Sequence, residues 1–213
     1  MNPIKSWLLE KTGKKCVENL KKHRFDAHFF DNCEDAKTKI MDMVKDYNTF
    51  GFGGSDTTRG MGIPEALNSL GKIIYDHNKE GLEFEKVMEY RKLQGSCDCF
   101  FSSANALSQT GEIINVDGVG NRVNATVFGP TKVIIVAGTN KIEKDVDSAL
   151  KRIREVAGPM RAKSLGMANP CSETGICMDC NSPTRICNIT TIIHRKPMLT
   201  DISVMIINEN LGY

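Results

Sequence analysis

Apolar and polar residues follow two rhythms along this chain, one helical and one strand-like. Between Lys5 and Lys22 apolar residues recur at helical spacing, although Gly13 interrupts the pattern, and residues 25–29 then alternate as in a strand. A second helix is predicted over 34–47 and a short strand over 49–52. This succession predicts an α/β protein with a Rossmann-like layered sheet flanked by helices.

The same rhythm continues through the rest of the chain. The run 132–137 is apolar throughout, as expected of a strand buried on both faces. We treat 1–213 as a single domain, with an N-terminal helical part over 1–48 and a cysteine-rich loop over 169–188 inserted before the last strands. Further strands are predicted over 72–75, 123–128, 189–194 and 202–207, and helices over 63–70, 82–93 and 143–162, the last broken at Gly158-Pro159.

Composition excludes several classes of function. With 40% hydrophobic residues, 25% charged residues and a net charge of +2, the chain has the profile of an ordinary soluble globular protein without a nucleic-acid partner. No apolar run approaches the roughly 20 residues that span a bilayer, and the N-terminus lacks the apolar core of a signal peptide. We therefore expect a cytoplasmic protein, not bound to a membrane. The densest basic cluster is predicted to be a solvated helix face: Lys14, Lys15, Lys21, Lys22 and Arg24.

Glycine and polar residues gather where the predicted strands end. Because the carboxyl ends of parallel strands meet at one edge of a sheet, we expect these residues to line a cleft for a small anionic metabolite. The candidate ligand-binding residues are Gly53, Gly54, Ser55, Thr57, Asn105, Asp117, Asn121, Arg122, Gly138, Asn140 and Lys141.

The chemistry of these residues leaves alternatives open. Gly53 and Gly54 lack Cβ atoms, so backbone N–H groups can approach a phosphate or carboxylate, but a mere tight turn is the alternative. Arg122 suits a bidentate carboxylate or phosphate, or a surface salt bridge. A structural or solvent-exposed role is favoured for His77, which follows a strand. Glu112 is expected to be an exposed hairpin residue rather than a nucleophile.

Half of the eight cysteines fall in one turn-rich stretch, with the spacing Cys-x5-Cys-x2-Cys-x6-Cys: Cys171, Cys177, Cys180 and Cys187. Four thiolates complete a metal site, and soft sulfur ligands select an iron–sulfur cluster or zinc. The alternatives are a disulfide pair, a set of buried inert thiols, and a metal-free redox dithiol at Cys177 and Cys180. We predict a metal, either a 4Fe–4S cluster or Zn.

A reducing cytoplasm also favours metal or redox chemistry over structural disulfides for a chain with this many cysteines. An iron–sulfur cluster would suit an anaerobic or oxygen-poor host. Cys97 and Cys99 are expected to serve packing, and a redox role for them or for Cys33 stays open.

In combination and in order, four segments resemble the lactate-utilisation (LUD) domain family over most of the chain. They are Gly53-Gly54-Ser55-x-Thr57; Ser103-Ala104-Asn105-Ala106 followed by Thr110-Gly111; Asn115-x-Asp117-Gly118-x-Gly120-Asn121-Arg122; and Lys132-Val-Ile-Ile-Val-Ala-Gly138-x-Asn140-Lys141. The resemblance implies a sheet like that of the sugar-phosphate isomerase and CoA-transferase superfamily. Glutamate is the nucleophile of the CoA transferases there, but the residues around Glu112 do not reproduce their signature.

Related LUD proteins are components of an iron–sulfur-dependent system that oxidises lactate to pyruvate. The resemblance therefore implies a redox accessory protein of organic-acid metabolism, with redox partner proteins, and leaves a homo-oligomer open. The ferredoxin-like cysteine repeats of some members are absent, so the late cysteine cluster is what remains to hold metal. The alternative is a non-redox ligand-binding, sensor or transferase-like protein with a structural zinc.

Overall fold

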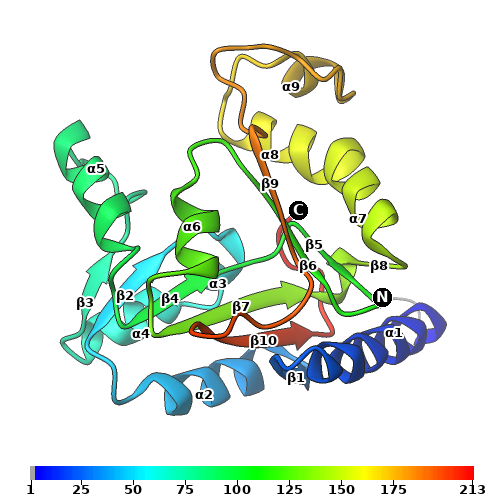
Figure 1. The fold of residues 1–213 in the computed structure, drawn as a ribbon, viewed down its shortest axis with the longest axis horizontal. Coiled ribbons are helices and arrows are strands. Elements are labelled where there is room, and N and C mark those ends of the chain that lie inside the picture. The colour runs from blue at the N-terminus through cyan, green and yellow to red at the C-terminus, as the bar shows by residue number, and fades with distance from the viewer. Residues whose placement is uncertain (1–2) are drawn as a thin grey trace.

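The computed structural model describes residues 3–213, whose strands form two sheets (Figure 1). All neighbours in the larger sheet are parallel, whereas the smaller sheet is mixed. The predicted α/β architecture is confirmed. In spatial order the larger sheet contains β1 (Asp26–Phe30), β10 (Asp201–Ile207), β7 (Lys132–Gly138), β4 (Cys99–Ser102), β2 (Thr49–Phe52) and β3 (Ile73–Tyr75), and the smaller one β8 (Ile142–Glu143), β5 (Ala106–Ser108), β6 (Ile113–Asp117) and β9 (Ile189–Ile193).

Helices connect these strands, and the first four predicted helices all form, with bounds shifted by at most three residues. Among residues 3–213, no helix combines the length and the apolar character needed to cross a membrane. The helices are α1 (Pro3–Lys22), α2 (Cys33–Val44), α3 (Asp56–Gly60), α4 (Ile63–Ser69), α5 (Phe84–Leu93), α6 (Asn121–Val127), α7 (Val146–Arg152), α8 (Gly158–Ser164) and α9 (Pro170–Thr174).

The larger sheet carries the hydrophobic core on both of its faces. Every residue of β7 is buried, and its side chains alternate between two clusters. Val133 and Ile135 pack with α1, α6 and the smaller sheet, whereas Ile134 and Val136 pack with α2 and α4. This period of two is the reason why an uninterrupted apolar run forms a central strand.

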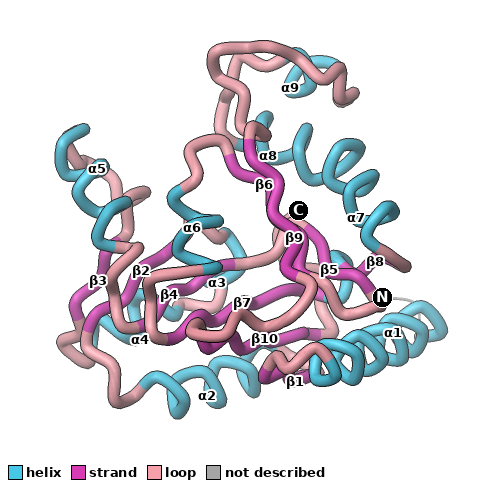
Figure 2. Tube along the Cα trace, in the orientation of Figure 1, coloured by secondary structure: helices cyan, strands magenta, loops and turns pink. Residues whose placement is uncertain are grey.

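The smaller sheet lies between the larger sheet and a third helical layer (Figure 1). Its Leu107 and Ile113 face the larger sheet, and its Ala106 and Ile114 pack against α7 and the turn that follows. The chain from α8 through α9 then runs as an extended loop to β9 (Figure 2). The cysteine-rich loop is therefore inserted before the last strands, as predicted.

Residues 123–128 are predicted as a strand, but residues 123–127 belong to α6 and Phe128 follows its end, so that prediction is wrong. The alternation of Val123, Ala125 and Val127 suits a strand, but capping decides the structure. The Asp117 carboxylate accepts hydrogen bonds from the backbone N–H groups of Gly120 and Val123, which start the helix. Gly120, with φ of 101°, makes the left-handed turn into it.

Two predicted interruptions of helices are also absent. α1 runs through Gly13, where a Cβ atom would lie 2.5 Å from the Phe29 ring, so glycine permits close packing there. The predicted break at Gly158-Pro159 is a π-helical turn over Ile153–Ala157, in which the N–H of Gly158 donates to the carbonyl of Ile153. The wider turn accommodates Pro159 at the start of α8 without ending the helix.

Gly138 provides a test of the packing at the end of β7. A Cβ atom there would lie 2.3 Å from the carbonyl oxygen of Glu209 and 2.8 Å from the nitrogen of Leu211. We expect Gly138→Ala to lower the free energy of unfolding by about 1–3 kcal/mol, measured by urea unfolding. Gly60→Ala, which meets no atom within 4 Å, is the matched control. Equal stability of the two variants would contradict the packing argument.

Candidate ligand cleft and cysteine segment

A cleft of about 450 Å³ opens beyond the carboxyl ends of β2, β3, β4 and β7. Its other walls are the turn between β6 and α6, the π turn with α8, and the cysteine-rich segment. The size is within the range of small-molecule sites. Among the predicted ligand-binding residues, those that line the cleft are Gly53, Gly54, Ser55, Thr57, Asn105, Asp117, Asn121, Arg122 and Lys141.

The two other predicted residues lie behind this surface, against the last segment of the chain. Asn140 accepts a hydrogen bond from the N–H of Leu211 and donates to the carbonyl of Gly212. Gly138 leaves room for Glu209 and Leu211. Their contacts hold residues 209–212 in place, and Gly212 itself lines the cleft.

In the glycine-rich loop after β2, other residues fill the space beside Gly53, and the Ser55 hydroxyl already has a hydrogen-bond partner. A Cβ atom on Gly53 would lie 2.9 Å from the Phe100 ring and 3.0 Å from Cγ of Arg122. Glycine at this position therefore lets the Arg122 stem pass. The Ser55 hydroxyl accepts the N–H of Thr58 and caps α3.

Arg122 is held by acceptors from several segments. Its Nη1 donates to Oδ1 of Asn115 at 2.6 Å and to the carbonyl of Ser103 at 3.5 Å. Its Nη2 donates to Oδ1 of Asn105 at 2.9 Å and to the carbonyl of Val116 at 2.5 Å. The guanidinium thus joins the end of β4 to both strands of the β5–β6 hairpin.

Asp117 completes this network. Its carboxylate lies 3.8 Å from Nε of Arg122. Burial opposes its ionisation, but Arg122 and the N–H groups of residues 119, 120 and 123 hold the pKa of Asp117 below its ordinary value. Asp117 is therefore a charged cap and counter-ion, fixed on the cleft wall.

Lys141 is the most deeply buried cation of the cleft, with 4% of the residue exposed. Its Nζ donates to the Ser103 hydroxyl at 2.9 Å. Burial, together with repulsion from Arg152 and Arg122, lowers the pKa of Lys141 to about 7. Close to neutral pH this amine is therefore present both as a cation and as a free base.

His77 is connected to the core by Gln94, a residue that no sequence motif singles out. Gln94 is fully buried, and its amide nitrogen donates to Nδ1 of His77 at 2.8 Å. Asn121 in turn donates to the Gln94 side-chain oxygen. Burial and the nearby Arg91 lower the pKa of His77, which lines the cleft as a half-buried imidazole.

Arg161 is another cleft residue that sequence patterns do not reveal. It extends from α8 and donates to the Asp56 carboxylate at 2.8 Å and to the carbonyl of Gly54 at 3.3 Å. These contacts tie the third helical layer to the loop after β2. Arg161 lies in a segment predicted only as an amphipathic helix, so its approach to this loop is a tertiary feature.

The cysteine-rich segment docks on the turn that follows β6. The N–H of Asn188 donates to the carbonyl of Asp117, and its side chain donates to the carbonyl of Gly118. A Cβ atom on Gly118 would lie 3.0 Å from Cα of Ile186, so glycine permits this close approach. Arg185 holds the loop from within by donating to the carbonyls of Cys180 and Cys187.

All four predicted ligands, Cys171, Cys177, Cys180 and Cys187, line the same cleft. Cys177 is exposed and the other three are half-buried, so they are not core thiols. Burial, followed by the proximity of Cys180 and Cys177, raises the pKa of Cys171. Within residues 3–213, no three metal-binding side chains already stand together as a coordination site.

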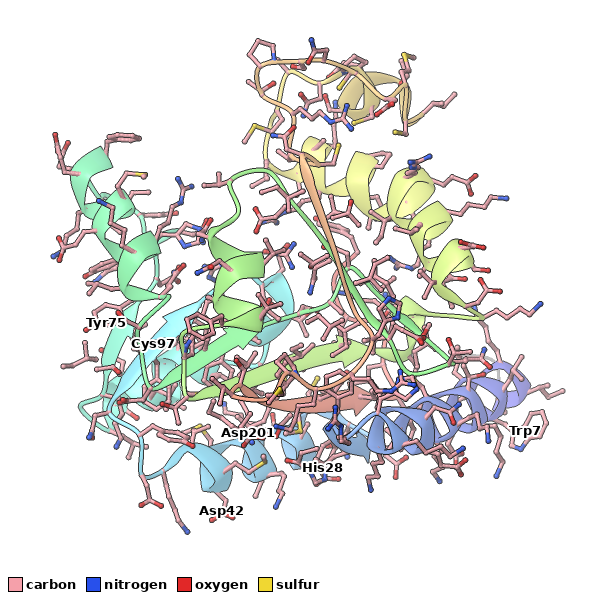
Figure 3. The ribbon with its side chains drawn as sticks, in the orientation of Figure 1. Trp7, His28, Asp42, Tyr75, Cys97 and Asp201 are labelled. Atoms are coloured by element: carbon pink, nitrogen blue, oxygen red, sulfur yellow. The ribbon has the colours of Figure 1, made fainter. Side chains whose placement is uncertain are left out.

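The remaining cysteines lie elsewhere. Cys97 and Cys99 are buried in the two core clusters, which confirms their packing role, and burial raises the pKa of Cys97 to about 12. Figure 3 shows Cys97 against the larger sheet, away from the cysteine-rich segment. Cys16 is also buried, and Cys33 donates to the Glu209 carboxylate.

Glu112, expected to be an exposed hairpin residue, is buried, so this expectation is wrong. Its carboxylate accepts hydrogen bonds from the hydroxyls of Ser108 and Thr110, close to His23 and His194. The hairpin is covered by α1 and the turn that follows it, because Asn19 and His23 bond to its backbone. Glu112 does not line the cleft.

A sequence model of the LUD domain matches residues 13–207, and the chain therefore belongs to the LUD domain family, which is associated with lactate utilisation. The fold is similar to the crystal structure, at 1.70 Å resolution, of a DUF162 family protein from Deinococcus radiodurans. The two share 11% sequence identity with a TM-score of 0.54, over 93% of this chain and 98% of that one, which supports the fold alone. Among curated proteins, no significant sequence match is found.

The Arg122 network predicts a large effect on stability. We expect Arg122→Ala to lower the free energy of unfolding by about 2–4 kcal/mol, because buried acceptors lose their donors and Asp117 loses its counter-charge. Arg195→Ala is the matched control, since Arg195 is exposed and donates only to a backbone carbonyl. Denaturant unfolding measures both variants. A change no larger than that of the control would show that the network does not support the wall.

Proposed function

We propose that this LUD domain binds a small anionic metabolite in the cleft, beside a metal held by the four cysteines, and serves as a redox accessory component of organic-acid metabolism. The observation that carries the proposal is the charge of the cleft. Its lining contains five arginines and Lys141, against three side-chain carboxylates. The association of the family with lactate utilisation supports an organic acid as the ligand.

The excess of cations is concentrated on particular residues of the cleft. Each carboxylate of the cleft already has an arginine neighbour: Asp56 with Arg161, Asp117 with Arg122, and Asp179 with Arg185. Among the described residues, Lys141, Arg91 and Arg154 have no carboxylate within 4 Å. Lys141 is buried and Arg91 is half-buried, whereas Arg154 is exposed. Lys141 and Arg91 favour an anionic ligand, because burial of a cation without a counter-charge costs free energy.

The apolar part of the lining supports a ligand that contains a short carbon chain. Ile153, Ala157 and Pro159 present an apolar strip on the helical wall, opposite the polar ends of the strands. An apolar wall with a few convergent charged groups is typical of small-molecule sites. A ligand with a carboxylate or phosphate on a short carbon chain would match both the charged groups and the apolar strip.

The four cysteines fit a metal in number and in chemical softness, and all of them face this cleft. An iron–sulfur cluster held by Cys171, Cys177, Cys180 and Cys187 would supply one-electron transfer with redox partner proteins. Zinc held by the same residues would instead stabilise the cysteine-rich segment, which Asn188 and Arg185 already hold in place. The cleft would then serve a non-redox ligand-binding role.

Anion binding is tested with oxalate, a small dianion without a reactive carbonyl. We expect Lys141→Met to weaken oxalate binding roughly tenfold or more, measured by titration calorimetry at fixed ionic strength. Since the pKa of Lys141 is about 7, its positive charge is lost as the pH rises, so oxalate affinity should fall between about pH 6 and pH 8. Lys21→Met, exposed on α1, should bind like the wild type. Absence of oxalate, phosphate and lactate binding by the wild type would refute the ligand proposal.

The metal is tested on protein purified without oxygen or chelator. We expect about four irons with acid-labile sulfide and an absorption band bleached by dithionite. Cys180→Ser should lose the metal, whereas Cys33→Ser, a half-buried cysteine outside the cleft, should retain it. About one zinc in colourless protein would support the non-redox role. Full metal retention by Cys180→Ser would show that the ligand set is misassigned.

A further inference from the structure

The amine of Lys141 lies at the inner end of the cleft. Lys141 ends the 3-10 turn Thr139–Lys141 that follows the central strand β7, so its backbone is fixed by the core. Its Nζ bonds to the Ser103 hydroxyl, and a Cβ atom built on Gly212 would lie 3.3 Å from it. The amine is therefore held between the ends of β4 and β7 and the last segment of the chain, and it reaches the cleft.

The surroundings of this amine favour its neutral form. Burial disfavours its positive charge most, Arg152 and Arg122 repel that charge, and the more distant Asp56 opposes them only in part, with a weaker repulsion from Arg161. Arginine keeps its charge in proteins, so the repulsion is relieved when Lys141 loses its proton. Arg152 cannot turn away easily, since it donates to the carbonyls of Asn140 and Asn105. A desolvated lysine beside other cations is an activated nucleophile.

Lys132, at the opposite end of β7, shows the usual arrangement for a buried lysine. It is as inaccessible as Lys141, but its Nζ lies 2.6 Å from the Asp201 carboxylate and 4.0 Å from that of Asp26. These carboxylates are counter-charges for its ammonium group. The two buried lysines at and just beyond the ends of β7 therefore differ in their neighbours: carboxylates lie beside Nζ of Lys132, whereas within residues 3–213 no carboxylate lies within 4 Å of Nζ of Lys141.

We propose that Lys141 is a nucleophilic amine that forms an imine with a small anionic aldehyde or ketone bound in the cleft. The inference rests on the proposed function, because the same cleft must hold the anion. Electrophilic carbonyl carbons are the partners of amine nucleophiles in proteins. The unpaired Arg91 and Arg154 of the lining would hold the carboxylate or phosphate of such a compound.

The step is a condensation without oxidation or reduction. The Nζ lone pair of neutral Lys141 attacks the carbonyl carbon and forms a carbon–nitrogen bond. Nζ gives up one of its two protons and keeps the other, a second proton comes from solvent water, and the carbonyl oxygen takes up both and leaves as water when the carbon–oxygen bond breaks. The protonated imine carries the same positive charge as the lysine ammonium, so the anion of the ligand stays neutralised.

Reductive trapping tests this proposal on the intact protein. The wild type is incubated with glyoxylate, the smallest anionic aldehyde, and sodium cyanoborohydride at pH 7.5, and peptide mapping by mass spectrometry locates the carboxymethyl groups. We expect Lys141 to react roughly tenfold or more faster than Lys132 and the surface lysines. Its rate should rise with pH to a plateau with a midpoint near 7, and excess oxalate should suppress the reaction.

A charge-conserving variant separates the imine from simple anion binding. Lys141→Arg retains a cation but not the nucleophile, so it should show no modification at position 141, and its oxalate affinity is measured beside that of the wild type; thermal unfolding checks that it is folded. If wild-type protein binds oxalate but Lys141 is modified no faster than surface lysines, the imine proposal is wrong and the ligand proposal stands. If neither oxalate binding nor selective modification is observed, both proposals fail.

Discussion

The buried guanidinium of Arg122 bonds to acceptors after β4, on the β5–β6 hairpin and near the Asp117 carboxylate. These acceptors come from the loop after β4 and from the paired β5–β6 hairpin, and they would lose hydrogen bonds if the two parts moved apart. The loop after β2 packs against the same side chain, since Gly53 leaves room for the aliphatic part of Arg122. The cysteine-rich segment depends on it indirectly, because that segment docks on the turn at Asp117 and Gly118. The walls of the cleft are thus one connected polar structure.

Much of the fold could be predicted from the sequence because burial follows periodicity. The apolar run of β7 has one solution in a layered α/β protein, a strand covered on both faces. Residues 123–127 have a pattern that fits either a strand or a helix, and the decision comes from Asp117, whose carboxylate caps the helix. Glu112 was misplaced for a similar reason, because local sequence gives no sign that α1 covers the hairpin.

Some residues of the candidate site could also be predicted from the sequence, and others could not. Strand-end residues such as Lys141 and Asn105 could be grouped in advance because parallel strands bring their carboxyl ends together. Arg161 and Gln94 could not, since their contacts join segments far apart in the sequence. The electrostatic character of Lys141 could not be predicted either, because it results from the burial of that amine and from the arginines that the fold brings near it.

The position of β10 has a consequence for how the molecule is made. This strand lies between β1 and β7, and within residues 3–213 β1 pairs with no other strand, with Asp26 opposite Ser203. During synthesis, therefore, β1 has to wait until residues 201–207 emerge, about 170 residues later, before it finds its neighbour. The cysteine-rich segment precedes β10, so it leaves the ribosome before the larger sheet can close. The four cysteines proposed as metal ligands are thus present on the chain before the larger sheet is complete.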